Sequence, residues 1–361
     1  MSRARDLADL GGSADAGGLT GRNLIINGAM NVAQRSTSVA DVGGSSGYFT
    51  CDRWRVDTGN TAGRVTMSQA SITDLPGFAN ALKLDVTTDD TSLASGEVFR
   101  VGQRIEGQNL QQIAKGTASA KALTLSFYVK GNAAATYVAQ LKDADNTRVN
   151  TQNFSVTTSW TRVELTYVAD TTGTLGDDNA NSLEVMFWLH GGSDFTSGTF
   201  ASNTWASETN ANNYAGSNTS IFDSTDRELF ITGVQLEVGE TATPFEHRSY
   251  GDELALCQRY FAVLQDTTAA YAGGFGFCNS TTKTKVCFPL GVSLRANPTV
   301  NVTAATIDIR NNATNTAASS VSAAIAQGTN LYLDVNAASG LATNHACAID
   351  PKQNMTFDAE L

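Results

Sequence analysis

Charged side chains are scarce in this sequence, and acidic residues outnumber basic ones. Asp, Glu, Lys and Arg make up 16% of the 361 residues, well below the usual quarter. This scarcity argues against long surface helices, which use Glu and Lys freely. The formal net charge of −11 argues against nucleic-acid binding, because contact with a phosphate backbone needs clustered Lys and Arg.

The sequence also offers little for metal or cofactor binding. Its five cysteines form no CxxC pair, and its three histidines form no HExxH or other paired spacing, so we expect no metal and no cofactor. The odd number of cysteines, spread along the chain, indicates buried free thiols from a reducing compartment. A Cys278–Cys287 bridge across a hairpin is the alternative.

Long apolar segments are missing as well. No apolar run approaches the roughly 20 residues that a membrane-spanning helix needs. The opening stretch MSRARDLADLGGSADAGG contains arginines but no apolar core of a secretory signal. We therefore expect no insertion into a membrane.

Catalytic motifs are weak. The stretch from Gly43 to Gly47 matches GxSxG, but a nucleophile elbow needs a buried strand before it and a helix after it, and here the motif lies in a Gly/Ser run. No GxxxxGK[ST] or GxGxxG occurs. The acidic pairs at 89–90 and 177–178 are expected to face water, and the sequence does not say how far apart they lie in space. The chain is predicted not to be an enzyme.

What the sequence does contain is a series of alternating segments. Apolar residues occupy every second position, which is typical of half-buried antiparallel strands. Turn residues separate the segments at intervals typical of a β-sandwich. The clearest segments are DRWRVDT, ALKLDVTT, ALTLSFYVKG, WTRVELTYVA and SLEVMFWLHG.

These patterns predict an all-β chain in several parts, a β-sandwich plus a smaller C-terminal β-rich domain joined by a short helix. The first part is too poor in apolar residues to fold alone. The predicted boundaries are an N-terminal attachment peptide over 1–20, the sandwich over 21–246, the connecting helix over 247–262 and the C-terminal β domain over 263–361.

The segment ELFITGVQLEVGETATPFEHRSYGDELALCQRYF joins the two β domains. Its first ten residues predict a strand that pairs no further than Pro244, because proline cannot donate a ladder hydrogen bond. Phe245 is predicted to pack back against the sandwich. Simple alternation along the strand places on one side Phe230, Thr232, Val234, Leu236 and Val238.

The end of the same segment predicts an amphipathic helix from residue 250 to residue 261. Four apolar residues recur at spacings of 0, 4, 7 and 11 and would share one helical face. That spacing suits packing against a symmetry-related copy of the chain. The predicted oligomer interface is formed by Tyr250, Leu254, Cys257 and Phe261.

Aromatic residues suggest a ligand site. In SLEVMFWLHG, Trp188 and His190 lie on the face opposite the core residues, and a long polar loop with four aromatic residues follows, from 191 to 220. Sugars stack on aromatic rings while polar groups bind their hydroxyls. The predicted carbohydrate-binding cluster is Trp188, His190, Asp194 and Trp205. The alternative is a satellite core under the long loop, or a subunit interface.

Several strings resemble a known family. TGRNLIINGAMNVAQRSTS followed by DRW, LTLSFYVKG, GVQLEVGETATPFEHRSYGDELALCQRYF and SLRANPTVNV resemble virion proteins of tailed bacteriophages. The opening peptide looks like the attachment peptide of phage tail fibres, and the residues expected to make that contact are Arg3, Arg5, Asp6, Leu7 and Leu10. The resemblance implies a jelly-roll sandwich similar to carbohydrate-binding modules, usually trimeric and without catalysis. It does not reach residues 311–361.

The hypothesis from these observations is a homotrimeric tail fibre that is made in the bacterial host cytoplasm and located in the virion tail. It would bind tail or other virion proteins through its N-terminus and a host-surface glycan through its sandwich. A trimer would cover exposed sheet edges and add avidity. The alternatives are a capsid decoration or head-fibre protein and, disfavoured by the lack of a solenoid repeat, a polysaccharide depolymerase.

Overall fold

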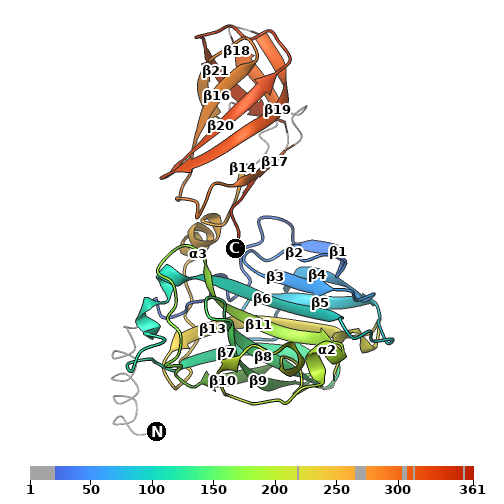
Figure 1. Ribbon diagram of the computed structural model, residues 1–361. Coiled ribbons are helices and arrows are strands. Elements are labelled where there is room, and N and C mark those ends of the chain that lie inside the picture. The colour runs from blue at the N-terminus through green and yellow to red at the C-terminus, as the bar shows by residue number, and fades with distance from the viewer. Residues whose placement is uncertain (1–20, 218, 265–273, 303–306, 312–313, 353) are drawn as a thin grey trace. The chain divides into compact units, whose positions relative to one another are not determined.

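The computed structural model describes residues 21–361 except 218, 265–273, 303–306, 312–313 and 353 (Figure 1). The predicted all-β class is confirmed. The chain divides into two compact units, one that ends at Tyr250 and one that comprises Gly251–Glu360. The division falls inside the segment 247–262 that was predicted to connect the two β domains. The predicted attachment residues Arg3, Arg5, Asp6, Leu7 and Leu10 lie outside the described residues.

The first unit contains two facing antiparallel sheets (Figure 1). Six strands form one sheet, in the order β1 (Ser38–Val42), β4 (Arg64–Ser71), β5 (Asn80–Thr88), β13 (Glu228–Val238), β7 (Leu123–Gly131) and β10 (Thr161–Tyr167). Seven strands form the other, in the order β12 (Ala206–Ser207), β9 (Arg148–Val156), β8 (Ala135–Asp143), β11 (Asn181–Gly191), β6 (Val98–Glu106), β3 (Arg55–Gly59) and β2 (Gly47–Tyr48). Short helices lie in the connections: η1 (Gly107–Asn109), η2 (Gln111–Ile113), α2 (Ser193–Thr196), η3 (Asn210–Asn212) and η4 (Ile221–Asp223).

The core between the two sheets is built from the inward residues of the alternating strands. Phe127 of β7 and Phe187 of β11 are fully buried, and their ring centroids lie 4.8 Å apart in an edge-on arrangement. Trp54 stacks on the same Phe187 ring. Each such side chain stabilises the fold by about 1.5–3 kcal/mol through burial. Period-two patterning therefore identified these core positions correctly.

Strand β13 departs from simple alternation at a bulge. Leu229 and Ile231 face the core, but Gly233 has φ +61° and the register against β7 shifts between Thr232 and Gln235. The extra residue turns Val234 into the core with Leu229 and Ile231. The prediction that Phe230 and Thr232 share a side with Val234 and Leu236 is therefore wrong, because a bulge reverses the alternation.

We expect Gly233→Ala to destabilise the sandwich by about 1–3 kcal/mol. A Cβ atom at this position would lie 2.8 Å from the Phe78 ring and 2.9 Å from the Tyr128 ring, and φ is positive. Both the contact and the left-handed backbone penalise a side chain. Urea unfolding of the variant would measure the loss. Gly239→Ala is the matched control, because Gly239 also has positive φ but no atom within 4 Å of the added Cβ. Equal losses in both variants would contradict the role assigned to the rings.

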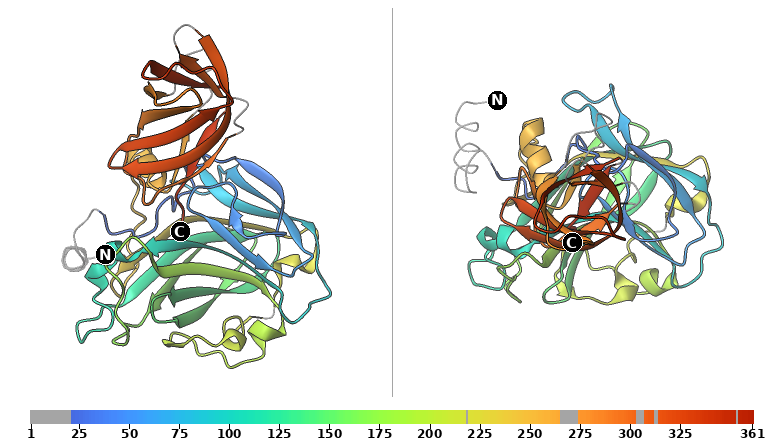
Figure 2. Two further views of the ribbon diagram at one scale, coloured as in Figure 1. Left: turned by 45° about the horizontal axis from the view of Figure 1, so that its top comes forward. Right: turned by 90° about the horizontal axis from the view of Figure 1, so that it is seen from above.

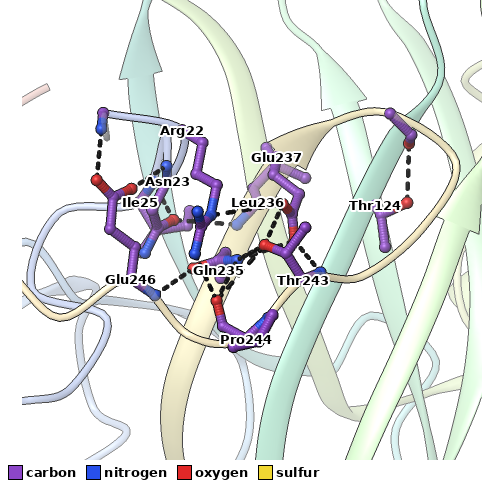
Figure 3. Close-up of polar contacts among 12 residues, drawn as sticks. Arg22, Asn23, Ile25, Thr124, Gln235, Leu236, Glu237, Thr243, Pro244 and Glu246 are labelled. Atoms are coloured by element: carbon purple, nitrogen blue, oxygen red, sulfur yellow. Dashed lines mark hydrogen bonds and ion pairs between the residues drawn. The ribbon is translucent and has the colours of Figure 1, made fainter. Parts of the chain in front are cut away.

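A hydrogen-bond network anchors the first described residues of the chain to the end of β13 (Figure 3). The Glu246 carboxylate accepts hydrogen bonds from the backbone N–H groups of Gly21 and Asn23. The Glu246 N–H in turn donates to Gln235 Oε1 at 2.8 Å, and Gln235 Nε2 donates to Glu237 Oε1 at 2.8 Å. The described sandwich therefore begins, at residue 21, beside the Pro244 segment that ends it.

The second unit holds α3 (Tyr250–Gln258), which begins one residue before the division, and two sheets. A three-stranded sheet has the order β14 (Phe261–Leu264), β22 (Met355–Asp358) and β17 (Thr299–Asn301). Six further strands close into a barrel (Figure 2), in the order β15 (Gly274–Cys278), β16 (Lys283–Pro289), β20 (Asn330–Ala337), β19 (Thr314–Gln327), β18 (Ile307–Asn311) and β21 (Ala346–Pro351). The smaller C-terminal β domain is thus present, and its closed barrel includes strands from residues 311–361, which the family resemblance does not reach.

The predicted helical interface needs correction. Helix α3 ends at Gln258, the chain turns at Tyr260, and Phe261 opens strand β14. Cys257 and Phe261 are buried, Leu254 is half-buried, and Tyr250 is 61% exposed. The four residues do not form one continuous helical face, because the spacing of 11 crosses the end of the helix.

The structure also bears on the predicted state of the cysteines and on membrane-spanning helices. All five cysteines are free, so the alternative Cys278–Cys287 bridge is not formed. Within the described part of the chain, no helix has both the length and the apolar character needed to cross a bilayer.

Candidate functional site

The predicted sugar platform on β11 is covered. Trp188 is fully buried, its Nε1–H donates to Gln140 Oε1 at 3.0 Å, and its ring packs on Phe195 and Tyr214 from the long loop. The Arg100 guanidinium carbon lies 4.8 Å from the Trp188 ring centroid. The expectation that Trp188 presents a ring to a ligand is corrected in favour of the alternative, a satellite core under the loop.

The other three members of that predicted cluster have separate partners. His190 is fully buried, Asp194 is exposed at α2, and Trp205 is half-buried. The Trp205 Nε1–H donates to the Val168 carbonyl at 2.8 Å. The four residues therefore do not form one open binding surface. The reason is that the residues of the outward face of β11 are covered by the loop that follows the strand.

A buried charge network holds Trp205 and its surroundings. Lys115 Nζ pairs with the carboxylates of Asp143 and Asp170, the second at 3.0 Å, and lies 5.3 Å from the Trp205 ring centroid. Arg148 donates two hydrogen bonds to Asp170, at 2.9 and 3.1 Å. Burial opposes ionisation of Asp170, but the hydrogen bonds from Arg148 and Lys115 outweigh it and lower the pKa of this carboxyl. This network is structural, because its charges are satisfied internally.

Aromatic rings gather instead on the outer side of the six-stranded sheet. We call this set the outer aromatic face: Phe78, Tyr128, Trp160, Phe230 and Phe245, all half-buried. Phe78 lies 5.3 Å from Tyr128 and 5.2 Å from Phe245, measured between ring centroids. Trp160 and Phe230 form a second pair at 6.3 Å. Phe245 thus packs on the sandwich as predicted.

Charged groups lie between these rings. Asp74 accepts a hydrogen bond from Trp160 Nε1 at 2.9 Å and one from Lys130 Nζ at 2.6 Å, and these bonds, that from Lys130 first, lower the pKa of Asp74. Lys130 Nζ lies 5.1 Å from the ring centroids of both Trp160 and Phe230. Lys83 approaches the Phe230 ring to 5.5 Å. The face therefore combines partly exposed rings with groups that can donate and accept hydrogen bonds.

Sequence reasoning missed the outer aromatic face because no single segment contains it. Phe230 stands opposite Lys83 of β5 and Lys130 of β7 in the sheet register, and Trp160 immediately precedes β10. Alternation in ALTLSFYVKG does place Tyr128 and Lys130 outward, which was the available signal. The sequence pattern did not show the bulge at Gly233, so simple alternation grouped the outward Phe230 with Val234 and Leu236, which are buried in the core.

A groove lies beside the edge strand β10. This groove has a volume of about 740 Å³ and includes Lys121, Thr166, Val168 and Glu240 in its lining. None of its described lining residues is aromatic. It offers charge but no ring on which a sugar could stack, so the outer aromatic face is the stronger candidate for ligand binding.

Three buried ionisable groups cluster elsewhere in the first unit. One ligand atom each from Asp90, Glu97 and His190 lies within 4.8 Å of the others. His190 Nε2 lies 3.3 Å from Glu97 Oε2, and its Nδ1 lies 2.7 Å from Ser220 Oγ. Burial lowers the pKa of His190, while its bond to Glu97 acts in the opposite sense. This set could hold a metal ion, although no metal was expected from the sequence.

Comparisons with known proteins place the chain in no family. No family model matches, and no curated protein matches. Among solved structures, the enzymatically active domain of tailspike protein 4 from bacteriophage CBA120 is 13% identical over 60% of this chain and 21% of that chain, with a TM-score of 0.31. The chain thus spans about a fifth of that tailspike structure.

Two sugar-binding proteins are similar at the same level. A putative sugar binding protein from Bacteroides thetaiotaomicron is 15% identical over 60% of this chain and all of that chain, with a TM-score of 0.32. A family 11 carbohydrate-binding module from Clostridium thermocellum, in complex with a mixed-linked tetrasaccharide, is 14% identical over 54% and 91%, with a TM-score of 0.27. No family assignment follows from similarities at this level.

Proposed function

We propose that this chain is a structural protein of a tailed-phage virion, a trimeric tail fibre that binds a host-surface glycan through the outer aromatic face. The glycan-binding part of the proposal rests on the composition of the outer aromatic face. Trp160 and Phe230 present partly exposed rings, and Asp74 and Lys130 place hydrogen-bonding groups beside them. Sugars combine apolar C–H faces with hydroxyls, and rings flanked by a few polar groups suit both.

The virion part of the proposal rests on the sequence resemblance and on the modular architecture. The peptide over 1–20 attaches the chain to the tail. The sandwich begins at residue 21, where Glu246, just after Pro244, hydrogen-bonds the backbone of Gly21 and Asn23. The second unit, with its barrel, forms a further module. No catalytic step and no nucleic-acid partner are part of this proposal.

Immunogold labelling of intact virions tests the location. Antibodies against the C-terminal unit should label the tail and leave the head unlabelled. Label on the head alone would overturn the tail-fibre proposal in favour of a capsid decoration or head-fibre protein. Release of reducing ends from host polysaccharide by the purified chain would contradict the non-enzymatic part.

We expect a trimer in solution. Light scattering on the purified chain should give about three times the chain mass of 38.0 kDa. Leu254 is half-buried on α3 and can still be covered by a neighbouring chain. Leu254→Asp is therefore expected to shift the mass toward that of a single chain, because a carboxylate buried at such a contact costs several kcal/mol when it has no partner. A single-chain mass for the unmodified protein would contradict the prediction.

A further inference from the structure

Asp90 and Glu97 differ from Asp143 and Asp170, two other acids buried in the sandwich. The two side chains belong to residues that are 6% and 4% exposed. Lys115 pairs with the buried carboxylates of Asp143 and Asp170. No Lys or Arg forms an ion pair with Asp90 or Glu97 among the residues that the structure describes; His190 is their cationic candidate. Two buried carboxylates beside one imidazole leave an excess of negative charge, which is costly unless a cation joins them.

The three side chains also bring one possible ligand atom each close together. The Asp90 Oδ2 atom accepts hydrogen bonds from Thr61 Oγ1 at 2.8 Å and from the Ala62 N–H at 2.7 Å, which fix the carboxylate. Glu97 Oε1 accepts no hydrogen bond from any described residue, and Oε2 faces His190 Nε2 at 3.3 Å. One ligand atom from each residue lies within 4.8 Å of the other two. Donor atoms that bind one tetrahedral ion at about 2.0–2.2 Å each lie roughly 3.3–3.6 Å apart. The 3.3 Å between His190 Nε2 and Glu97 Oε2 already fits, and binding an ion would draw the three groups together within the present 4.8 Å.

The far side of the imidazole is held as it is in metal sites. His190 Nδ1 lies 2.7 Å from Ser220 Oγ, and the same hydroxyl oxygen accepts a hydrogen bond from the Phe222 N–H at 3.0 Å. A ligating histidine commonly donates its second ring N–H to such a partner, which fixes the tautomer and the ring orientation. Nε2, which faces Glu97, then carries no proton, and its lone pair can bind a metal ion.

We propose that Asp90, Glu97 and His190 bind a divalent first-row transition-metal ion, with Zn²⁺ as the reference ion. An imidazole with two carboxylates suits zinc, whereas calcium and magnesium favour sites made of oxygen alone. Three protein ligands leave a fourth tetrahedral position for water.

Such an ion would link parts of the chain that are far apart in sequence. Asp90 and Glu97 lie in the connection from β5 to β6, and His190 lies near the end of β11. Ser220 connects the site to the segment that covers the satellite core of Trp188. The ion would thereby stabilise the loop-covered side of the sandwich, apart from the outer aromatic face.

The test uses the full chain, stripped with a chelator and then titrated with Zn²⁺, Ca²⁺ or Co²⁺. We expect one Zn²⁺ per chain by mass spectrometry of the metal content. At a hundredfold excess over Kd, the melting temperature of the sandwich should rise by about 5 °C or more. Co²⁺ should give the visible absorption of a tetrahedral site without the sulfur bands that cysteine ligation would add. Stabilisation by Ca²⁺ and not by Zn²⁺ would overturn the transition-metal assignment.

Variants locate the site. Glu97→Gln and His190→Gln should each abolish the Zn²⁺-dependent rise in melting temperature. His345→Gln, at an exposed histidine of the second unit, should keep the full rise. If the wild-type chain binds no Zn²⁺, or if Glu97→Gln binds it equally well, the proposal is wrong. If the wild-type chain binds no Zn²⁺, the Asp90, Glu97 and His190 side chains are held together by hydrogen bonds without a metal ion. This result does not depend on whether any variant folds.

Discussion

Replacing Lys115 with Met is expected to lower the free energy of unfolding of the sandwich by about 3–5 kcal/mol, because it removes the ammonium group between two buried carboxylates. Lys115, Asp143 and Asp170 are each less than a tenth exposed, so water cannot replace the lost charge. Asp170 keeps its ion pair with Arg148, and Asp143 keeps its hydrogen bonds from Asn146. These neutral hydrogen bonds do not replace the cation that the buried Asp143 carboxylate loses. For a unit of this size, such a loss lowers the melting temperature by roughly 6–20 °C.

The matched control for Lys115→Met is Lys121→Met, which removes an exposed lysine from the same connection. It should change stability by less than about 0.5 kcal/mol. The pH dependence provides a second readout. Because the pKa of Asp170 is lowered in the folded chain, its contribution to stability is present at neutral pH and is lost as pH falls through that lowered pKa. Similar unfolding energies for the two lysine variants would rule out the assigned network.

The second large effect concerns ligand binding. Trp160→Ala should weaken binding to oligosaccharides released from the host cell surface by roughly thirtyfold, which corresponds to about 2 kcal/mol. The substitution removes the ring and also the Nε1–H that orients Asp74. Lys130 loses one of the two rings near its ammonium group. Titration calorimetry on the purified variants would measure the change.

Trp205→Ala is the control for this experiment. Trp205 is also a half-buried tryptophan with a bonded indole N–H, but it is not part of the outer aromatic face. Its removal should leave oligosaccharide affinity within about twofold of the wild type, at a temperature where the variant is folded. Loss of binding in Trp205→Ala, with Trp160→Ala unaffected, would return the ligand site to the long loop.

Alternation in the sequence identified the fold class because it reports directly on which strand face is buried. Phe127 and Phe187 stand at alternating positions and meet across the core. Alternation failed at β13, where the bulge at Gly233 reverses the pattern, and helical spacing failed at α3, where the helix ends before Phe261. A bulge at a glycine or the end of a helix shifts which residues face the core. Whether a bulge forms, or where a helix ends, depends on the surrounding fold and is not set by the local sequence alone.

The candidate sites were harder to predict because they are assembled from distant segments. The alternation within β11 alone predicts that Trp188 faces outward. In the fold, Phe195 and Tyr214 of the following loop cover its ring. Asp90 and His190 come together only because β5, β6 and β11 and their connections meet in space. The pairing of Phe230 with Lys130 likewise depends on sheet register. Such juxtapositions have no signature in a single sequence.

The outer aromatic face of the sandwich is proposed to contact the host. The most direct measurement is competition, in which purified chain is added to host cells before the phage that carries this protein, and free phage is counted over time. The wild-type chain and Trp205→Ala should slow adsorption with equal potency, whereas Trp160→Ala should require at least thirtyfold more protein. Undiminished adsorption in the presence of excess wild-type chain, or equal potency of Trp160→Ala, would contradict the account.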